Sequence, residues 1–469
     1  MQKKNELIQV KQYFATHPNS VKYDRKKSGL ASSYIRDSEG TIIRLENKAD
    51  PDYVLGIGGY GRVKKTSSDQ ETATKIQTYP LDQDEFVRED IEQEAKINLD
   101  TGLAVGPLVT RIDEEKGIVK FYQEMHKMEE SLQSRIPKLN KQQKMRAASD
   151  YLLLMSHLHE GISANSNTPY IQGDPATKNA MYDQNGNMRL IDFGLSQPLE
   201  YVDQIANENK PVVQALYFSE DDGTFSPIFD DELFQSFPAY LQNLLRWENV
   251  NEHEVRPENL ITFINATLIA YQHNPDLSSA DVEQLKTNPP QQTLWIEQHK
   301  REQKILKIPD RNAQKALAKM TKKLEHYQNF FADQLLRESY DETNPKYKLL
   351  VAKKHAIDTM LTIPSDLSAQ EALVRIDGAL MTHQALLSQP VPAMRTKFMV
   401  GLKARVRRVG SEVAIDTLQK EIDVYLEEQS SAYRAALEEF RAQAGTPSSD
   451  ISSSVDDDED RSKSPPNSL

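Results

Sequence analysis

Two short motifs, joined by a predicted β-hairpin, restrict most strongly what this chain of 469 residues can fold into. The first, QGDPATKN, covers residues 172–179, and the second, Asp192-Phe193-Gly194, begins thirteen residues after Asn179. The strand-like pieces NAMYD and MRLID lie between them and are joined by a turn at residues 184–187. Phosphoryl transfer needs a carboxylate that orients the acceptor hydroxyl and oxygen ligands for Mg²⁺. Asp174, Asn179 and Asp192 would supply this set, although either motif alone could be an ordinary turn.

A glycine-rich segment, GIGGYGRV, occupies residues 56–63 after the strand-like run YVL. Glycines let the backbone approach phosphate groups closely, because no Cβ blocks the contact and a positive φ costs little. By itself the pattern G-x-G-x-x-G is weak, since a glycine-rich turn or a dinucleotide-binding fingerprint looks similar. A helix should follow in the dinucleotide case, whereas a β-type run follows here.

One lysine and one glutamate form the next candidate pair. Lys75 lies fourteen positions after Gly61, where strand alternation turns its side chain to the face of the glycine segment. An ammonium there could neutralise nucleotide phosphates, and Glu94, on a predicted helix at residues 85–99, could hold it in place. Glu89 and Glu92 are alternatives to Glu94, and each of these side chains could simply be solvated.

In this order the motifs resemble those of the eukaryotic-like protein kinases, over residues 53–196. The resemblance implies a two-lobed fold that binds Mg-ATP between its lobes. It implies Lys75 and Glu94 as a catalytic ion pair, Asp174 as catalytic base, and Asn179 and Asp192 as Mg²⁺ ligands. It also implies a phosphate loop, an adenine site and a hinge beginning at a gatekeeper, Gln123. The nucleotide contacts implied are Gly56, Ile57, Gly58, Gly59, Tyr60, Gly61, Val63, Ala73, Lys75, Glu124 and Met125.

The sequence departs from this family in its catalytic loop. Gln172 and Gly173 replace the family's His-Arg, so the arginine that commonly receives an activation-loop phosphate is absent. Ala176 replaces a lysine, and Lys178 is the candidate that contributes its charge to the γ-phosphate. No Ala-Pro-Glu motif follows Asp192-Phe193-Gly194. Ser226-Pro227-Ile228 lies about where the family carries that motif. Gly-Asp also resembles the aminoglycoside and choline kinases, which usually carry histidine at the position of Ala176.

Composition restricts the setting of the chain. There is no cysteine, which excludes disulfides and thiolate chemistry. The net charge of −13 argues against nonspecific binding to nucleic acid. No apolar run has the length of a signal peptide or of a membrane span, so we expect no transmembrane segment and a cytoplasmic protein, or one secreted without a cleaved signal into a host cytosol.

Strand and helix patterns divide the chain into four parts. We expect an N-terminal extension at 1–48, a protein-kinase-like domain at 49–245, an α-helical region at 246–444, and a disordered Ser/Asp-rich tail at 445–469. Within the helical region the longest predicted runs are 308–339 and 404–444. The fold class expected is α+β, a two-lobed kinase-like fold with an α-helical C-terminal extension.

A second resemblance is compositional. A divergent kinase core, a helical extension and an acidic, serine-rich end are similar to kinases that intracellular bacteria inject into host cells through type IV secretion. That similarity implies a protein substrate in the host and a host or cellular partner for the helical region, although an acidic tail is also common as a solubilising segment.

The function expected is ATP- and Mg²⁺-dependent transfer of the γ-phosphoryl group to Ser or Thr hydroxyls of a protein. Three alternatives stay open at this point. They are a small-molecule phosphotransferase of the aminoglycoside or choline type, a pseudokinase scaffold, and an enzyme that transfers AMP from the same Mg-nucleotide site.

Overall fold

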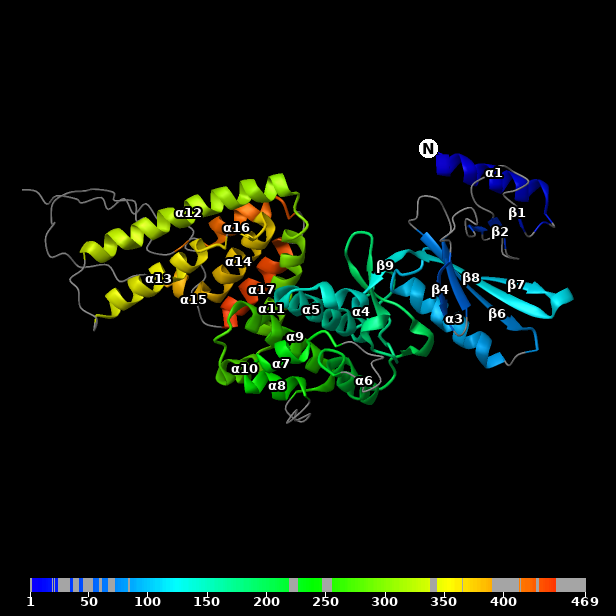
Figure 1. Ribbon diagram of the computed structural model, residues 1–469, viewed down its shortest axis with the longest axis horizontal. Coiled ribbons are helices and arrows are strands. Elements are labelled where there is room, and N and C mark those ends of the chain that lie inside the picture. Colours follow the sequence, from blue (N-terminus) through cyan, green and yellow to red (C-terminus); the bar gives the residue numbers. More distant parts are fainter. Residues whose placement is uncertain are drawn as a thin grey trace, which may run out of the picture. The chain divides into compact units, whose positions relative to one another are not determined.

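The computed structural model divides into two compact units, Met1–Thr287 (unit 1) and Asn288–Leu469 (unit 2). The described residues are 2–18, 20, 22–23, 34–36, 42–44, 54–58, 61–65, 72–82, 85–218, 227–246, 255–337, 344–364, 366–389, 413, 415–426 and 430–443. Among these residues, all strands belong to unit 1, and unit 2 contains helices (Figure 1). The predicted disordered tail lies outside the described residues.

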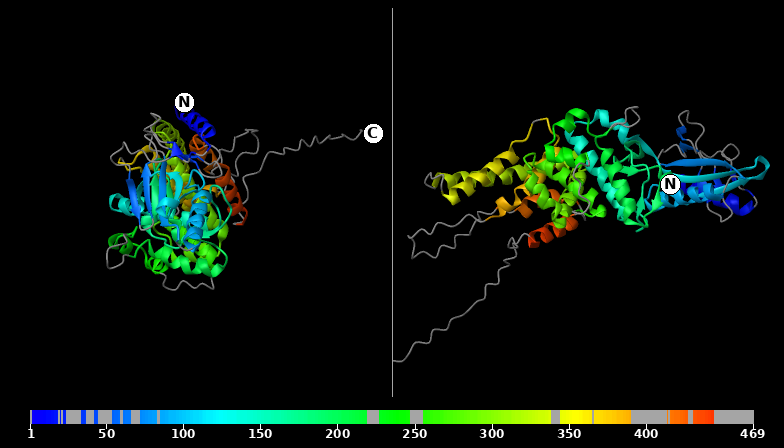
Figure 2. Two further views of the ribbon diagram at one scale, coloured as in Figure 1. Left: turned by 90° about the vertical axis from the view of Figure 1, so that its right-hand side faces the viewer. Right: turned by 90° about the horizontal axis from the view of Figure 1, so that it is seen from below.

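A five-stranded antiparallel sheet forms the part of unit 1 that carries the glycine-rich segment and Lys75. Its order is β4-β5-β6-β8-β7, and Figure 2 shows the sheet, in blue to cyan, from two further directions. Strands that follow one another in the sequence are paired and have short connections. The exception is β6 and β7, which are not paired and are separated by a helix. The strands are β4 Val54–Gly58, β5 Gly61–Lys65, β6 Thr72–Pro80, β7 Val109–Asp113 and β8 Ile118–His126.

Helix α3, Glu85–Asp100, is the helix predicted at residues 85–99. It buries Ile91, Ala95 and Asn98, which recur at helical spacing and define one face of the helix. Asn98 donates from Nδ2 to Gln123 Oε1 of β8 at 2.9 Å, and Gln123 Nε2 donates to the carbonyl of Ala95 at 2.7 Å. These buried hydrogen bonds fix the rotation of α3 against the sheet and so decide which of its glutamates faces inward.

The N-terminal extension forms a small element of its own. Helix α1, Gln2–Thr16, precedes a sheet of order β1-β2-β3, made of Lys22–Tyr23, Tyr34–Arg36 and Ile42–Arg44. Val10, Phe14 and Tyr34 are buried together. This small apolar cluster packs α1 against the three-stranded sheet. The residues that pack the five-stranded sheet are not part of it.

Helices dominate the rest of unit 1. Between them lie the antiparallel hairpin β11–β12, which extends through β9, and the short pair β10–β13. The hairpin is the one that the turn at residues 184–187 predicts. The elements are β9 Met128–Ser131, α4 Leu132–Arg135, α5 Lys141–His159, β10 Tyr170–Ile171, β11 Ala180–Asp183, β12 Met188–Leu190, β13 Gln197–Pro198, α6 Val202–Gln214, α7 Asp231–Gln235, α8 Ala239–Leu245, α9 Pro257–His273 and α10 Ser279–Lys286.

The contacts of α9 place the boundary between the units. Helix α9 is apolar around most of its circumference and packs against α5 and α6, with Ile264 and Leu268 fully buried. Asn265 Nδ2 donates to the carbonyl of Ser149 in α5 at 3.1 Å. Helices α9 and α10 therefore belong to unit 1, whereas the sequence pattern begins the helical region at residue 246. A helical pattern shows that a helix forms and does not show which helices pack together.

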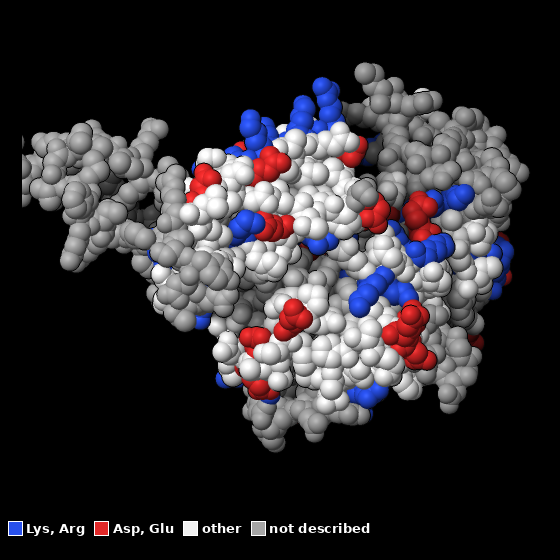
Figure 3. Space-filling view, turned by 60° about the vertical axis from the view of Figure 1, so that its left-hand side comes forward, with Lys and Arg blue, Asp and Glu red and all other residues white. Residues whose placement is uncertain are grey.

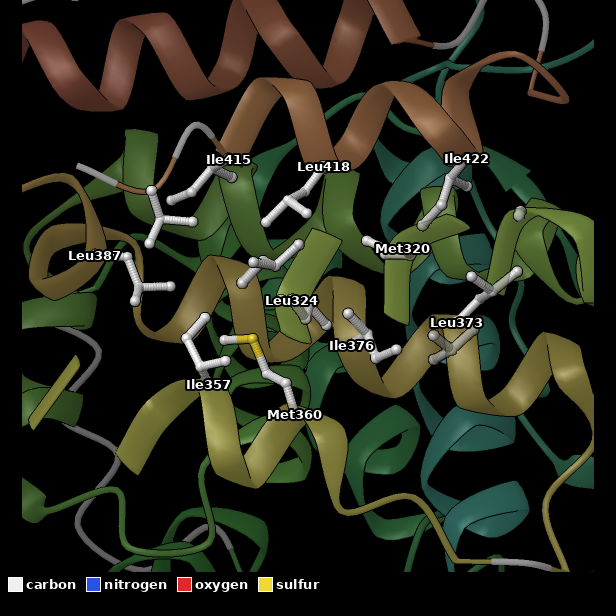
Figure 4. Packing of buried hydrophobic residues seen from close by; sticks show 14 of the residues in the cluster. Met320, Leu324, Ile357, Met360, Leu373, Ile376, Leu387, Ile415, Leu418 and Ile422 are labelled. Atoms are coloured by element: carbon white, nitrogen blue, oxygen red, sulfur yellow. The ribbon is translucent and has the colours of Figure 1, made fainter. Parts of the chain in front are cut away.

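Unit 2 is an all-helical bundle in its described residues. Its elements are α11 Pro289–Ile305, α12 Asp310–Arg337, α13 Pro345–Leu361, α14 Ala369–Thr382, α15 Gln384–Ser388, α16 Ile415–Asp423 and α17 Ser430–Gln443. Figure 4 shows how α12, α13, α14 and α16 contribute Leu324, Ile357, Ile376 and Leu418 to one core. The predicted run at 308–339 corresponds to α12. The predicted run at 404–444 contains two helices, α16 and α17, and its residues 404–412 lie outside the described residues.

A buried charge cluster ties α11, α14 and α16 together in unit 2. Arg301 Nε donates to Asp377 Oδ2 at 2.8 Å, and its Nη1 donates to Asp423 Oδ1 at 2.5 Å. Gln298 also donates to Asp377. On the outside of the unit, Lys315 and Lys322 of α12 are exposed. Figure 3 shows basic side chains along the upper edge of the face drawn there, with acidic and basic side chains interspersed below them.

The chain therefore has a mixed α+β fold, with an N-terminal antiparallel sheet and helices followed by a helical C-terminal part. The sequence-based prediction is confirmed at this level. Among the described residues no helix combines the length and the apolar character needed to cross a membrane.

Candidate active site

A cavity of about 670 Å³ opens in unit 1 beside the β4–β5 hairpin. Its volume is in the range of sites that hold a cofactor-sized molecule. It is lined by Val54, Leu55, Gly56, Ile57, Gly61, Arg62, Val63, Lys65, Ala73, Lys75, Glu94, Leu103, Met125, His126, Lys127, Met128, Glu129, Met181, Ile191 and Asp192. The glycine segment, the third strand, α3 and the Asp-Phe-Gly motif thus meet at one cavity.

The glycine-rich segment forms an antiparallel hairpin, with Gly58 opposite Gly61. A strand and not a helix follows it, so the dinucleotide-binding alternative is wrong. A Cβ on Gly61 would lie 2.5 Å from the carbonyl oxygen of Ile76, so glycine is required there for β5 to pack on β6. A Cβ on Gly56 would meet nothing within 4 Å, so the backbone at Gly56 borders open cavity. The predicted contacts Gly59 and Tyr60 lie outside the described residues.

Lys75 and Glu94 lie side by side in the cavity wall. Lys75 Nζ contacts Glu94 Oε1. Glu94 Oε2 lies 3.4 Å from Nε2 of Gln77, which is on β6 with Lys75. The Glu94 side chain is buried, whereas Glu89 and Glu92 are exposed and Glu92 pairs with Arg88 instead. The packing of α3 thereby selects Glu94 from the three glutamates that the sequence left open, and Lys75 remains partly open to the cavity.

The structure brings Ala73, Val63 and Met125 to the cavity but does not bring Glu124 there. Glu124 Oε1 accepts a hydrogen bond from Thr72 Oγ1 at 2.8 Å, and its carbonyl accepts one from the N–H of Val105 at 2.8 Å. The carboxylate and the carbonyl of Glu124 thus each have a partner within the protein, and its contact with the nucleotide stays a prediction.

The end of β8 and the start of β9 line the cavity where the sequence had placed Glu124. They contribute His126, the connecting residue Lys127, Met128 and Glu129, and Lys127 Nζ pairs with Glu129 Oε1 at 2.9 Å. Met181 and Ile191, from the β11–β12 region, add apolar surface. Sequence reasoning missed these residues, because nothing in the run YQEMHKMEES marks the residue at which β8 ends.

Asp174, Lys178 and Asn179 form a tight polar group in residues 172–179, the segment predicted as the catalytic loop. Asn179 Nδ2 donates to both the carbonyl and Oδ2 of Asp174 at 2.9 Å, and Lys178 Nζ lies 3.2 Å from the same Oδ2. The Asp174 side chain is about one-third exposed, so it can meet an acceptor from solvent. The carbonyl of Asn179 accepts from the N–H of Ile191 at 2.8 Å, which ties this group to the strand that leads into Asp192.

Asp192 has an unusual backbone conformation. Its φ of 59° and ψ of 64° make it the one residue other than glycine with a positive φ among the described residues. This conformation costs about 1–2 kcal/mol for a non-glycine residue. Gln172 Nε2 donates to the carbonyls of Ile191 and Asp192, at 3.1 and 3.3 Å. The side chain of Gln172 therefore helps to hold the turn that places Asp192 in the cavity wall.

The residues after Asp192 connect the site to α3. Phe193 is buried, and Gln93 Nε2 of α3 donates to the carbonyl of Ser196 at 2.8 Å. Only residues 195–201 separate Gly194 from α6, and within them β13 pairs with β10. This hydrogen bond therefore joins α3, which carries Glu94, to the segment that follows Asp192.

A second group of buried polar residues lies behind the catalytic loop. The N–H of Gly173 donates to Glu208 Oε1 at 2.7 Å, and Glu208 Oε2 lies 2.6 Å from His159 Nε2. Burial, with the nearby carboxylates of Glu208 and Asp174, raises the pKa of Tyr151 well above its usual value. Sequence analysis did not single out Glu208 or Tyr151, because no motif in the sequence marks either residue.

The oxygen donors of the site fit a magnesium ion. Among the residues that the structure describes, no group of three or more His, Asp or Glu side chains lies close enough to hold a metal by itself. Mg²⁺ is commonly bound through one or two carboxylates together with phosphate oxygens and water. Asp192 and Asn179 would provide protein ligands of this kind.

Comparison with known proteins finds no family model that matches the chain and no curated protein with a similar sequence. The chemistry of the site is therefore inferred from its own residues.

Proposed function

We propose that this protein is a Mg²⁺- and ATP-dependent protein kinase, with a two-lobed kinase-like fold, that transfers the γ-phosphoryl group to Ser or Thr hydroxyls. The observation that carries the proposal is the meeting of the Lys75–Glu94 pair, the glycine hairpin and Asp192 in one cavity. The Asp174–Asn179 group is hydrogen-bonded to Ile191, the residue that precedes Asp192. A cation, a metal-binding carboxylate and an exposed carboxylate base are the groups that phosphoryl transfer requires.

Each residue has a role that follows from its place. Lys75, oriented by Glu94, would neutralise phosphate oxygens of the nucleotide. Asp192 and Asn179 would hold Mg²⁺, which supplies charge neutralisation to the phosphates when it is bound. Asp174 would accept the proton of the acceptor hydroxyl, since it is the exposed carboxylate of the group. Lys178, 3.2 Å from Asp174, would supply the charge that Ala176 lacks.

A protein acceptor is favoured by the surface beside Asp174. Leu195, whose backbone packs against Gly173, is 66% exposed, and farther along the chain Tyr201 and Val202, at the start of α6, are 68% and 50% exposed. Exposed apolar side chains of this kind favour a polypeptide over a polar metabolite such as an aminoglycoside. The resemblance to injected bacterial kinases supports a host protein as acceptor, with the helices of unit 2 binding a host or cellular partner.

The test is phosphoryl transfer by the purified protein with Mg²⁺ and γ-labelled ATP, for the natural sequence and for Asp174→Ala. A gain of about 80 Da per site on a protein acceptor, or on the protein itself, in the natural sequence only would support the proposal. Asp203→Asn, an exposed aspartate of α6, is the matched control and should retain transfer. Label on a free metabolite, a mass gain of an adenylyl group, or bound ATP without any transfer would overturn it in favour of one of the three alternatives.

A further inference from the structure

Glu208 is a buried carboxylate that the proposed chemistry does not use. It lies on α6, and its side chain is 5% exposed, as is expected of a core residue and not of a solvated acid. Its two oxygens have different partners, the backbone N–H of Gly173 and Nε2 of His159. A buried carboxylate is costly unless such partners satisfy it, so the arrangement of all three residues is interdependent.

The contact joins three segments that are far apart in the sequence. His159 is the last residue of α5, Gly173 precedes Asp174, and Glu208 lies in the middle of α6. Both side chains of the pair are nearly inaccessible to solvent, at 4% for His159 and 5% for Glu208. Hydrogen bonds to a charged group in such surroundings are stronger than those at the surface. The catalytic loop is therefore attached, one residue before Asp174, to two helices at once.

Residue 173 has no room for a side chain that could anchor the loop. Its φ is +79°, and a Cβ there would lie 2.2 Å from the carbonyl oxygen of Leu195. Both facts require glycine, so no side chain at this position can anchor the loop. The backbone N–H is the one hydrogen-bond donor that Gly173 has, and Glu208 accepts its hydrogen bond.

We propose that Glu208 is a positioning residue, which with His159 fixes Gly173 and hence Asp174 in place for transfer, without a phosphate on the segment that follows Asp192. The proposal rests on the proposed kinase function. Residues 195–201 form a short connection, within which β13 pairs with β10. Glu208 already accepts the hydrogen bond that holds the loop at Gly173. The site is thus assembled by the fold itself.

The first test compares Glu208→Ala, Glu208→Gln and the control Asp203→Asn on the same helix. Glutamine can still accept from the N–H of Gly173 while its amide donates to an unprotonated Nε2 of His159, whereas alanine can do neither. We expect Glu208→Ala to lower kcat about 10- to 100-fold with little change in KM for ATP, because a misplaced base costs rate rather than binding. Glu208→Gln should recover most of kcat, and Asp203→Asn should behave as the natural sequence.

The second measurement does not depend on activity. Amide hydrogen exchange in the peptide that contains Gly173 and Asp174 should become faster in Glu208→Ala and stay slow in Glu208→Gln. Equal exchange in all variants, or a glutamine variant no better than alanine, would overturn the positioning role. If the natural sequence transfers no phosphate at all, the proposed function fails, whereas selective exchange at Gly173 would still show that Glu208 holds the loop.

Phosphatase treatment of the purified protein tests the remaining part of the inference. We expect kcat to stay within twofold after treatment, since no phosphate is needed to hold the loop. A loss of tenfold or more, restored by incubation with ATP, would show that a modification assembles the site and would contradict this part.

Discussion

The ammonium of Lys75, on β6, contacts the carboxylate of Glu94, on α3, in the wall of the cavity. The strand and the helix that carry them are adjacent in the sequence, and the hydrogen bond between Asn98 and Gln123 helps to fix the rotation of α3 that brings Glu94 to Lys75. Each member of the pair holds the other. Removing one leaves a partly buried charge without its partner, and moves the cation away from the position in which it could meet phosphate.

We predict that Lys75→Ala and Glu94→Gln each lower kcat/KM for phosphoryl transfer about 100-fold or more, because a positioned cation is among the largest contributions to stabilising charge in such a reaction. Steady-state kinetics with varied ATP would measure it. Glu92→Gln, two residues away on the exposed face, is the matched control and should leave kcat/KM unchanged, since its surface pair with Arg88 contributes little. Equal losses in Glu92→Gln and Glu94→Gln would contradict the selection of Glu94.

Replacing Asp192 should remove the dependence of nucleotide binding on Mg²⁺. In Asp192→Asn the cavity would keep its shape, but the proposed Mg²⁺ would lose its carboxylate ligand, so transfer should fall at least about 1000-fold. Calorimetric titration with ATP, with and without Mg²⁺, would show an affinity that Mg²⁺ no longer increases. Normal turnover in this variant, or the same increase by Mg²⁺ as in the natural sequence, would show that the metal site lies elsewhere.

The two ends of the glycine segment should respond differently to alanine. In Gly61→Ala the new Cβ would lie 2.5 Å from the carbonyl oxygen of Ile76, which is backbone and cannot move aside, so we expect about 1–3 kcal/mol of destabilisation. Gly56→Ala meets nothing within 4 Å and should unfold at the same denaturant concentration as the natural sequence. Denaturant midpoints would measure both. Equal destabilisation of the two variants would contradict the register of β5 on β6.

Local pattern in the sequence was sufficient for the elements that carry the site. Helix α3 and the β11–β12 hairpin lie where apolar spacing and the turn at residues 184–187 predict them. The motif residues Lys75 and Asp192 also line one cavity. These features depend on residues close together in the chain, or on motifs whose order is fixed by a small sheet followed by a hairpin.

Features set by tertiary packing could not be predicted in the same way. Glu89, Glu92 and Glu94 are equivalent in the sequence, and only the packed face of α3 distinguishes them. Glu124 was predicted as a nucleotide contact, but its side chain accepts a hydrogen bond from Thr72 and does not line the cavity. Glu208 lies thirty-five residues after Gly173, and no local pattern relates the two.

Asp183, at the end of β11, should make stability depend on acid pH. Burial by itself would raise the pKa of Asp183, but hydrogen bonds from the side chain and N–H of Asn187 and from the N–H of Asn185, with the charge of Arg189, outweigh it and lower the pKa below its usual value. A carboxyl group whose pKa is lowered on folding contributes stability above its ordinary pKa, and that contribution is lost as the pH falls through the lower, folded value.

We therefore expect Asp183→Asn to cost about 1–2 kcal/mol of unfolding free energy at pH 7, the usual effect of losing charge-assisted hydrogen bonds. The difference from the natural sequence should shrink as the pH falls below the ordinary aspartate pKa of about 4 and on through the lower, folded pKa. Urea midpoints for both proteins between pH 2 and pH 7 would measure it. A difference that stays constant with pH would show that the charge of Asp183 is not what stabilises the hairpin.

The buried cluster around Asp377 should control the stability of unit 2. Asp377 accepts from Arg301 Nε at 2.8 Å and from Gln298 Nε2 at 3.1 Å, and its side chain is inaccessible to solvent. Asp377→Leu would leave the buried Arg301 cation without one of its two carboxylates, which typically costs about 3–5 kcal/mol.

Amide exchange in α11 and α14 should become faster, while exchange in α9 of unit 1 serves as the internal reference. Asp366→Leu, an exposed aspartate nearby in the sequence, should leave all three helices unchanged. Faster exchange in α9 to the same extent as in α14 would show that the cluster stabilises the whole chain and not unit 2 alone.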